Sequence, residues 1–200
     1  MPRLSYDKVI SKAVAGEKIQ YGILNGNEKT VFIKVGSDGS IRGYQDKYLK
    51  MAHRAHARLG ATVICASNPD VDYNAQVVAD KAMISRVAAD CGVSDYEGYF
   101  VGTSDGGYQN ILLCQQVPQA RKLLGINASL NTVEDLVVQL QKLPHVEKTL
   151  VYGTKDEYVS QEIPALQTIA CENLEIITVE GANHEFKGMV DEFIALIDLL

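Results

Sequence analysis

Short apolar runs alternate with helix-like segments along almost the whole chain, and this alternation constrains the fold more than any other feature. The runs TVFIKV, ATVICA, YFVGT, TLVYG and LEIITV lack the regular polar residues of a strand with one face in water. Strands that helices cover on both faces have this character, so the pattern predicts a mostly parallel sheet between helices. Right-handed crossovers would then place the ligand-binding loops at the carboxyl ends of the strands.

The expected elements follow from periodicity and from helix-stop and turn signals. Two extended runs, 18–24 and 30–35, are separated by Asn25-Gly26-Asn27, and this spacing predicts a tight hairpin. Gly60 follows the first expected helix as a stop, and Asn131 or Thr132 caps a later one. The other expected strands are 61–66, 98–103, 120–127, 148–153 and 174–179, and the expected helices are 44–59, 74–91, 106–116, 132–143, 159–171 and 186–200.

Composition limits the class of protein. With 200 residues, 46% hydrophobic and 22% charged, the chain can bury a core, and we expect one α/β domain over residues 1–200. A net charge of −6 gives no broad attraction to nucleic acid or anionic lipid, so neither partner is expected. The opening residues lack the apolar core of a signal peptide, and no later run approaches the length of a membrane span, so the expected location is cytoplasmic.

The four cysteines, Cys65, Cys91, Cys114 and Cys171, are widely spaced and form no C-x-x-C pair. No histidine pair accompanies them at zinc-finger spacing, so no metal site is expected from them. A core of this size does not need disulfides to hold it together. We therefore expect reduced thiols.

The run YFVGTSDGGYQN carries a G-x-S-x-G motif where an expected strand turns into an expected helix. Such a sharp turn forces Ser104 into a strained backbone and brings chain segments close together, and glycine at positions 102 and 106 removes the side chains that would obstruct it. The motif therefore indicates a nucleophilic serine with Gly102 and Gly106 as structural residues. The alternative is an ordinary glycine-rich turn, such as a phosphate-binding helix terminus, although the G-x-G-x-x-G and G-K-[ST] patterns are missing.

A serine hydroxyl needs a neighbouring base to remove its proton. The chain has four histidines, His53, His56, His145 and His184. His53 and His56 fall inside an expected helix with no H-E-x-x-H pattern, so they are interpreted as surface residues. Only His184 lies in a loop at the carboxyl end of an expected strand. Alone it could merely cap or hydrogen-bond a loop, but together with Ser104 it is the candidate general base.

A carboxylate must accept a hydrogen bond from the imidazole and orient it. Asp156 follows the expected strand 148–153 in the sequence Gly153-Thr154-Lys155-Asp156, and this placement favours it. Glu157 is adjacent and remains an alternative. The loop after strand 120–127 offers Asn127 and Asn131 in place of an acid.

The segments VGTSDGG, YGTKDEYV and EGANHEF, in this order, resemble the nucleophile, acid and histidine motifs of the α/β-hydrolase superfamily. The resemblance spans nearly the whole chain and implies acyl-transfer hydrolysis through a covalent acyl-enzyme. It also implies an oxyanion hole formed by the backbone N–H groups of Ser37 and Asp105. The segment from Gly36 to Gly39 is similar to the family's H-G-x-x-G loop, except that Val35 stands where histidine is common.

Larger members of that superfamily carry a helical cap after the strand that precedes residues 128–131, and here the chain runs directly into the next helix. The resemblance therefore implies a fold without a cap domain, an open site and short acyl substrates. The leading hypothesis is a serine carboxylesterase or thioesterase with a small-molecule ester or thioester substrate, no metal and no organic cofactor, acting as a monomer or homodimer. The alternatives are a non-catalytic binding or interaction protein of this fold or, among enzymes, a small peptidase, amidase or acyltransferase.

Overall fold

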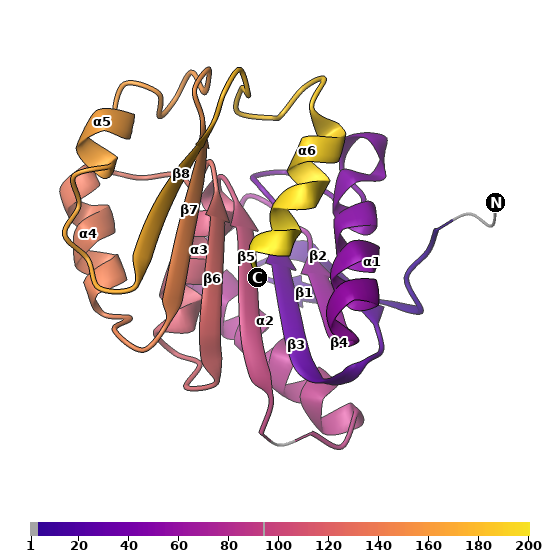
Figure 1. The fold of residues 1–200 in the computed structure, drawn as a ribbon. Helices are drawn as coiled ribbons and strands as arrows, with labels where there is room; N and C mark the ends of the chain where they lie inside the picture. The colour runs from indigo at the N-terminus through magenta and orange to yellow at the C-terminus, as the bar shows by residue number, and fades with distance from the viewer. Residues whose placement is uncertain (1–3, 94) are drawn as a thin grey trace.

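One eight-stranded, mostly parallel sheet forms the centre of the molecule (Figure 1). The computed structural model describes residues 4–93 and 95–200. The strands are β1 (Lys8–Val14), β2 (Glu17–Leu24), β3 (Asn27–Lys34), β4 (Ala61–Ala66), β5 (Glu97–Thr103), β6 (Ala120–Ile126), β7 (Glu147–Gly153) and β8 (Leu174–Val179). Their order across the sheet is β1-β2-β4-β3-β5-β6-β7-β8. β1 and β2 are antiparallel to their neighbours, and all pairs from β4 to β8 are parallel.

Helices lie on both faces of this sheet. The α-helices are α1 (Lys47–Leu59), α2 (Tyr73–Asp90), α3 (Asp105–Cys114), α4 (Val133–Gln141), α5 (Ile163–Leu166) and α6 (Val190–Ala195), and 3₁₀ turns cover Tyr44–Asp46 and Leu196–Leu199. α1 and α6 contact each other on one face, whereas α2, α3 and α4 follow one another on the other face (Figure 1). The prediction of a parallel sheet between helices is therefore confirmed.

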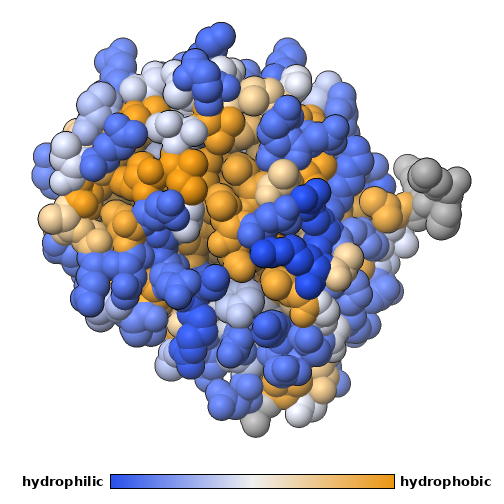
Figure 2. All heavy atoms as spheres, viewed as in Figure 1, coloured by the Kyte–Doolittle hydropathy of each residue, from blue (hydrophilic) through white to orange (hydrophobic). Residues whose placement is uncertain are grey.

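Two apolar clusters explain why the central strands lack polar alternation. One cluster joins the sheet to α2, α3 and α4, and the other joins it to α1 and α6. All six residues of β4 are buried because successive side chains enter opposite clusters. Figure 2 shows apolar residues gathered over β7, β8 and α6 on the face that carries α6, where Ile177 and Val179 of β8 remain only partly buried.

The hairpin predicted at Asn25-Gly26-Asn27 is wrong. β2 pairs antiparallel with β4, so the segment after it crosses to the far side of β4, where β3 begins. Gly26 is required there by a close approach of backbones, since a Cβ on it would lie 2.3 Å from the carbonyl carbon of Ala61. The actual hairpin joins β1 to β2 through Ala15 and Gly16, whose φ angles of 51° and 92° suit a primed two-residue turn.

Two predicted helices are much shorter than expected. Of the expected helix 159–171, only Ile163–Leu166 is α-helical, and Pro164, which has no N–H, lies in its first turn, where that group is not needed. Of the expected helix 186–200, α6 and the final 3₁₀ turn remain. Phe186 and Gly188 have φ angles of 54° and 81°, which a right-handed helix does not allow. The other predicted helices and strands are confirmed to within a few residues.

Two further features bear on the position of the site. Residues 127–132 alone connect β6 to α4, so the described residues contain no cap domain over the sheet. Within residues 4–93 and 95–200, no helix has the length and apolar character needed to cross a membrane. Because β3, β5, β6, β7 and β8 run parallel, the loops that follow them meet at one edge of the sheet, and no cap covers it among the described residues.

Candidate active site

The turn between β5 and α3 holds Ser104 in a strained conformation. Its φ and ψ are 53° and −128°, a region that non-glycine residues rarely occupy. The Ser104 amide donates to the carbonyl of Ile126, and its own carbonyl accepts from the amides of Gly107 and Ser129. These bonds hold the turn from both sides, so the hydroxyl projects at the carboxyl edge of the sheet.

The two flanking glycines have the steric role expected of them. A Cβ on Gly102 would lie 2.3 Å from the carbonyl oxygen of Gly106, and a Cβ on Gly106 would lie 2.3 Å from the carbonyl oxygen of Val35. Real Cβ atoms do not approach backbone this closely. The helix α3 can therefore pack directly on β5 and β3 only because both positions lack a side chain.

Ser104, His184 and Asp156 form one hydrogen-bonded row. His184 Nε2 lies 2.9 Å from Ser104 Oγ, and His184 Nδ1 lies 2.8 Å from Asp156 Oδ2. Asp156 is fully buried, and the side chain of His184 is 17% exposed. With the proton on Nδ1, the ring donates to the carboxylate and its Nε2 accepts from the serine hydroxyl. The second carboxylate oxygen of Asp156 accepts from the amide of Tyr158 at 2.9 Å, which fixes the carboxyl plane.

Asn127 links the loops that carry the acid and the histidine. It follows β6, is fully buried and has a left-handed φ of 44°. Its side-chain oxygen accepts from the amide of Gly153 at 2.8 Å, and its side-chain nitrogen donates to the carbonyls of Asn183 and His184. A buried amide satisfied in this way defines the positions of all three partners.

The loop after β3 runs beside Ser104. A Cβ on Gly36 would lie 3.3 Å from the Cβ of Ser104, and the Ser37 hydroxyl donates to the carboxylate of Asp105. In the part of the chain that the structure describes, the backbone amides of Ser37 and Asp105 have no acceptor. Two free N–H groups next to a serine hydroxyl can stabilise negative charge on a carbonyl oxygen.

A cleft of about 1070 Å³ opens above this row and is lined by Ser104, His184, Ser37 and Asp105 together with residues from α1, α2 and the loops after β6 and β7. Its volume is more than a short acyl chain occupies. Ser129, which the sequence did not single out, also faces the cleft, and its hydroxyl oxygen lies 3.3 Å from Ser104 Oγ.

Lys47 is a buried cation at the edge of the cleft. Its ammonium donates to the carbonyl of Glu185 at 3.1 Å and lies over the rings of Tyr48 and Phe193, 5.2 and 4.6 Å from their centroids. Burial lowers the pKa of Lys47, and the nearby Glu185 carboxylate partly opposes this. The contact anchors the residue next to His184 to the start of α1, and no motif in the sequence signals it.

The remaining histidines and the cysteines lie apart from this row. His53 Nε2 donates to the backbone oxygen of Ser5, His56 Nδ1 donates to that of Ala61, and His145 is exposed. The four cysteines are free thiols, as expected. Among residues 4–93 and 95–200, no three His, Cys, Asp or Glu side chains gather as metal ligands would.

The structure therefore brings together the residues selected from the sequence: Ser104, Asp156, His184, Ser37, Asp105, Gly102 and Gly106. Glu157, the alternative acid, is exposed, and the carboxylate that bonds His184 Nδ1 is that of Asp156. The contributions that sequence reasoning missed are the link made by Asn127, the hydroxyl of Ser129 and the cation of Lys47. In the sequence, Asn127 is only an amide where an acid could follow the expected strand 120–127.

Comparison with known proteins supports the fold. No protein-family model matches this sequence, and no curated protein matches it either. An α/β serine hydrolase homologue from Coxiella burnetii is 17% identical, with a TM-score of 0.75 over 100% of both chains. Est1E from Butyrivibrio proteoclasticus is 14% identical, with a TM-score of 0.76 over 96% of each chain. A thioesterase domain from the curacin biosynthetic pathway is 12% identical, with a TM-score of 0.63 over 96% of this chain and 98% of that one.

At such identities the likeness concerns the fold. The chain has the α/β-hydrolase fold, with a mostly parallel sheet, helices on both faces and no cap domain among the described residues. The resemblance that the three sequence motifs suggested is confirmed at this level. Chemistry must be argued from the site itself, because one fold supports many activities.

Proposed function

We propose that the chain is a serine hydrolase that cleaves a carboxylic ester or thioester through a covalent acyl-enzyme. The observation that carries this proposal is the unbroken row from Asp156 through His184 to Ser104, with both hydrogen bonds shorter than 3 Å. A serine hydroxyl in a strained turn, bonded to a histidine that a buried carboxylate orients, is the arrangement that activates serine as a nucleophile.

The first half of the reaction forms the acyl-enzyme. Ser104 Oγ attacks the carbonyl carbon while its proton moves to His184 Nε2, and the Asp156 carboxylate stabilises the imidazolium. The negative charge that develops on the carbonyl oxygen is stabilised by the amides of Ser37 and Asp105. The bond to the leaving oxygen or sulfur then breaks, and this atom takes the proton from His184.

The second half releases the acid. A water molecule gives a proton to His184 Nε2 and attacks the acyl carbon, and the bond to Ser104 Oγ breaks as the proton returns to the serine. His184 takes part in every proton transfer of this cycle, with Ser104, the leaving group and the attacking water as its partners. No metal or organic cofactor enters it.

The test uses a fluorophosphonate probe, which reacts with activated serines, followed by peptide mass spectrometry. We expect labelling at Ser104 and hydrolysis of p-nitrophenyl esters or acyl thioesters, with both activities lost in Ser104→Ala and His184→Ala. Ser85→Ala is the matched control, because the Ser85 hydroxyl is exposed on α2 and bonds only the carbonyl of Lys81. Labelling at Ser129 in place of Ser104, or no labelling of the folded wild type, would refute the proposal.

A further inference from the structure

Tyrosines dominate the apolar lining of the cleft. Five of the ten tyrosines of the chain face it: Tyr44, Tyr48, Tyr73, Tyr108 and Tyr158. The only aliphatic side chains among the described lining residues that are as large as valine, apart from the stems of two lysines, are Leu130 and Val159. A site for an alkyl chain needs only apolar area, whereas aromatic rings add directional contacts with another ring. This lining favours a ligand with a flat aromatic group.

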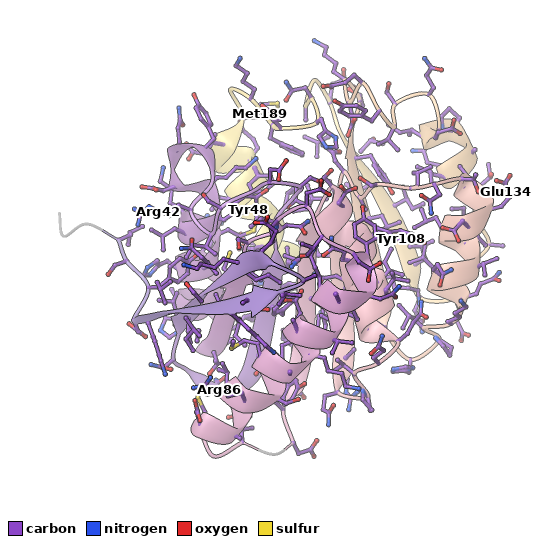
Figure 3. The ribbon with its side chains drawn as sticks, turned by 180° about the vertical axis from the view of Figure 1, so that it is seen from behind. Arg42, Tyr48, Arg86, Tyr108, Glu134 and Met189 are labelled. Atoms are coloured by element: carbon purple, nitrogen blue, oxygen red, sulfur yellow. The ribbon has the colours of Figure 1, made fainter. Side chains whose placement is uncertain are left out.

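One wall of the cleft is a tyrosine pair next to Ser104. The rings of Tyr73, at the start of α2, and Tyr108, in the first turn of α3, have centroids 6.4 Å apart and planes inclined by 48°. The Tyr108 hydroxyl donates to Asp135 Oδ2 at 2.7 Å, which fixes that ring, and Tyr73 is 37% exposed. Figure 3 shows Tyr108 on α3 near the edge where the strands end, whereas Arg86, in the last part of α2, lies far from it.

His184 and Tyr158 line the other side of the cleft. The Tyr158 ring meets the His184 ring edge-on, with centroids 4.8 Å apart, and Tyr158 is 75% exposed. In acyl transfer the histidine gives its proton to the leaving group, so that group departs on the side of His184. The acyl group must then extend away from His184, toward Asp105. Tyr108 lies three residues after Asp105 on α3, so the two side chains are neighbours on that helix, and the Tyr108 ring pairs with that of Tyr73. The tyrosine pair therefore lies on the Asp105 side, and the Asp105 carboxylate, together with burial, raises the pKa of Tyr73.

We propose that the substrate's acyl group carries an aromatic ring that packs against Tyr73 and Tyr108. This inference rests on the proposed function and names the substrate class for the same site. An aromatic ring that packs against this pair would form a cluster of three rings. The Tyr108 hydroxyl already donates to Asp135, so it is not available as a donor to the substrate. Tyr44 and Tyr158, which are 61% and 75% exposed, also line the cleft and add aromatic area at its solvent-exposed side.

The test compares two esters that differ only in aromaticity, ethyl 3-phenylpropanoate and ethyl 3-cyclohexylpropanoate. Their carbonyl groups have the same intrinsic reactivity, and the cyclohexyl compound is the more hydrophobic of the two. We expect kcat/KM to favour the phenyl ester by about tenfold in the wild type. Tyr73→Leu should lose most of this preference and still hydrolyse the cyclohexyl ester, whereas Tyr73→Phe should retain the preference because the ring remains.

The control variant is Val78→Ala, an exposed apolar position on the same helix but outside the cleft, which should leave both rates unchanged. Equal rates for the two esters, or faster cleavage of the cyclohexyl ester, would overturn the inference while leaving Ser104-dependent hydrolysis intact. Cleavage of neither ester by a protein whose Ser104 still reacts with a fluorophosphonate would also overturn it. Absence of labelling would instead refute the proposed function.

Discussion

The side-chain nitrogen of Asn127 lies 2.9 Å from the backbone oxygen of His184, although the two residues are 57 positions apart in the chain. The same amide group reaches Asn183 through its nitrogen and Gly153 through its oxygen. Asp156 lies three residues after Gly153. The loops that carry the carboxylate and the imidazole are therefore held by one fully buried side chain, that of the residue that follows β6.

Replacing Asn127 by alanine should reduce kcat for ester hydrolysis by about 10- to 100-fold, because a displacement of the imidazole by about 1 Å is enough for such a loss. KM should change less, since Asn127 does not line the cleft. Asn127→Asp should be at least as harmful, because an ionised carboxylate cannot donate to the two carbonyls. Steady-state kinetics of the folded variants measure both effects.

Asn173→Ala is a matched control for this experiment. Asn173 also has a left-handed φ, 54°, and its side chain also donates to a backbone carbonyl, that of Pro144. It precedes β8 and so lies at the opposite edge of the sheet from Ser104. If both substitutions lowered kcat equally, Asn127 would have no special role in positioning the histidine loop.

Gly102→Ala should destabilise the protein by about 2 kcal/mol or more, because the new methyl group would overlap the backbone of Gly106 and Gly107. Backbone cannot move aside as a flexible side chain can. Urea unfolding with a probe of tertiary structure measures the change. Gly92→Asn is the comparison: its φ of 72° strains any side chain, but asparagine least, and nothing lies within 4 Å of a Cβ there, so we expect a smaller loss of about 1 kcal/mol or less.

The strands and the placement of the reactive loops were predictable from sequence because their signals are local. A run such as ATVICA can be buried on both faces only in a covered sheet, and parallel strands bring their carboxyl ends to one edge. That geometry alone selected His184 over the three other histidines. The glycines at 102 and 106 identify Ser104 as the nucleophile in the sequence. The close backbone contacts at these two positions explain why glycine is needed there.

The rest depended on long-range contacts. Asn25-Gly26 has the same local appearance in a hairpin and in a crossover, and the pairing of β2 with β4 decides between them. The pair of Tyr73 and Tyr108 joins two separate segments, because Tyr73 begins α2 and Tyr108 lies in α3, and no sequence motif indicates such a pair. The role of Asn127 also cannot be predicted from the sequence, because its three partners are brought to it only by the fold.

Lys34→Met should be strongly destabilising, by about 3–5 kcal/mol, because it leaves the carboxylate of Asp80 buried without its cation. Both side chains are almost fully buried, with Lys34 Nζ 2.9 Å from Asp80 Oδ2, and the ammonium also donates to Ser67 and Gln76. The double change Lys34→Met with Asp80→Leu should recover much of the loss, because no unpaired charge then remains. Lys18→Met, at an exposed position on β2, should change the free energy of unfolding by less than about 0.5 kcal/mol.

Tyr152→Phe should leave stability at pH 7 unchanged or raise it by about 1 kcal/mol. The Tyr152 hydroxyl is buried and finds no hydrogen-bond partner within the described residues, so its removal breaks no bond and relieves a desolvation cost.

The same substitution should alter the dependence of stability on pH. Burial, and to a smaller extent the Asp156 carboxylate, raise the pKa of Tyr152 well above its usual range, whereas an unfolded tyrosine ionises near pH 10. Below about pH 10 the phenol is protonated in both states and adds no slope. Above it the unfolded state loses the proton first, so the wild type should lose about 1.4 kcal/mol per pH unit relative to Tyr152→Phe. Urea unfolding of both proteins at pH 7, 9, 10 and 11 measures this; a constant difference across the series would mean that the phenol ionises equally in both states.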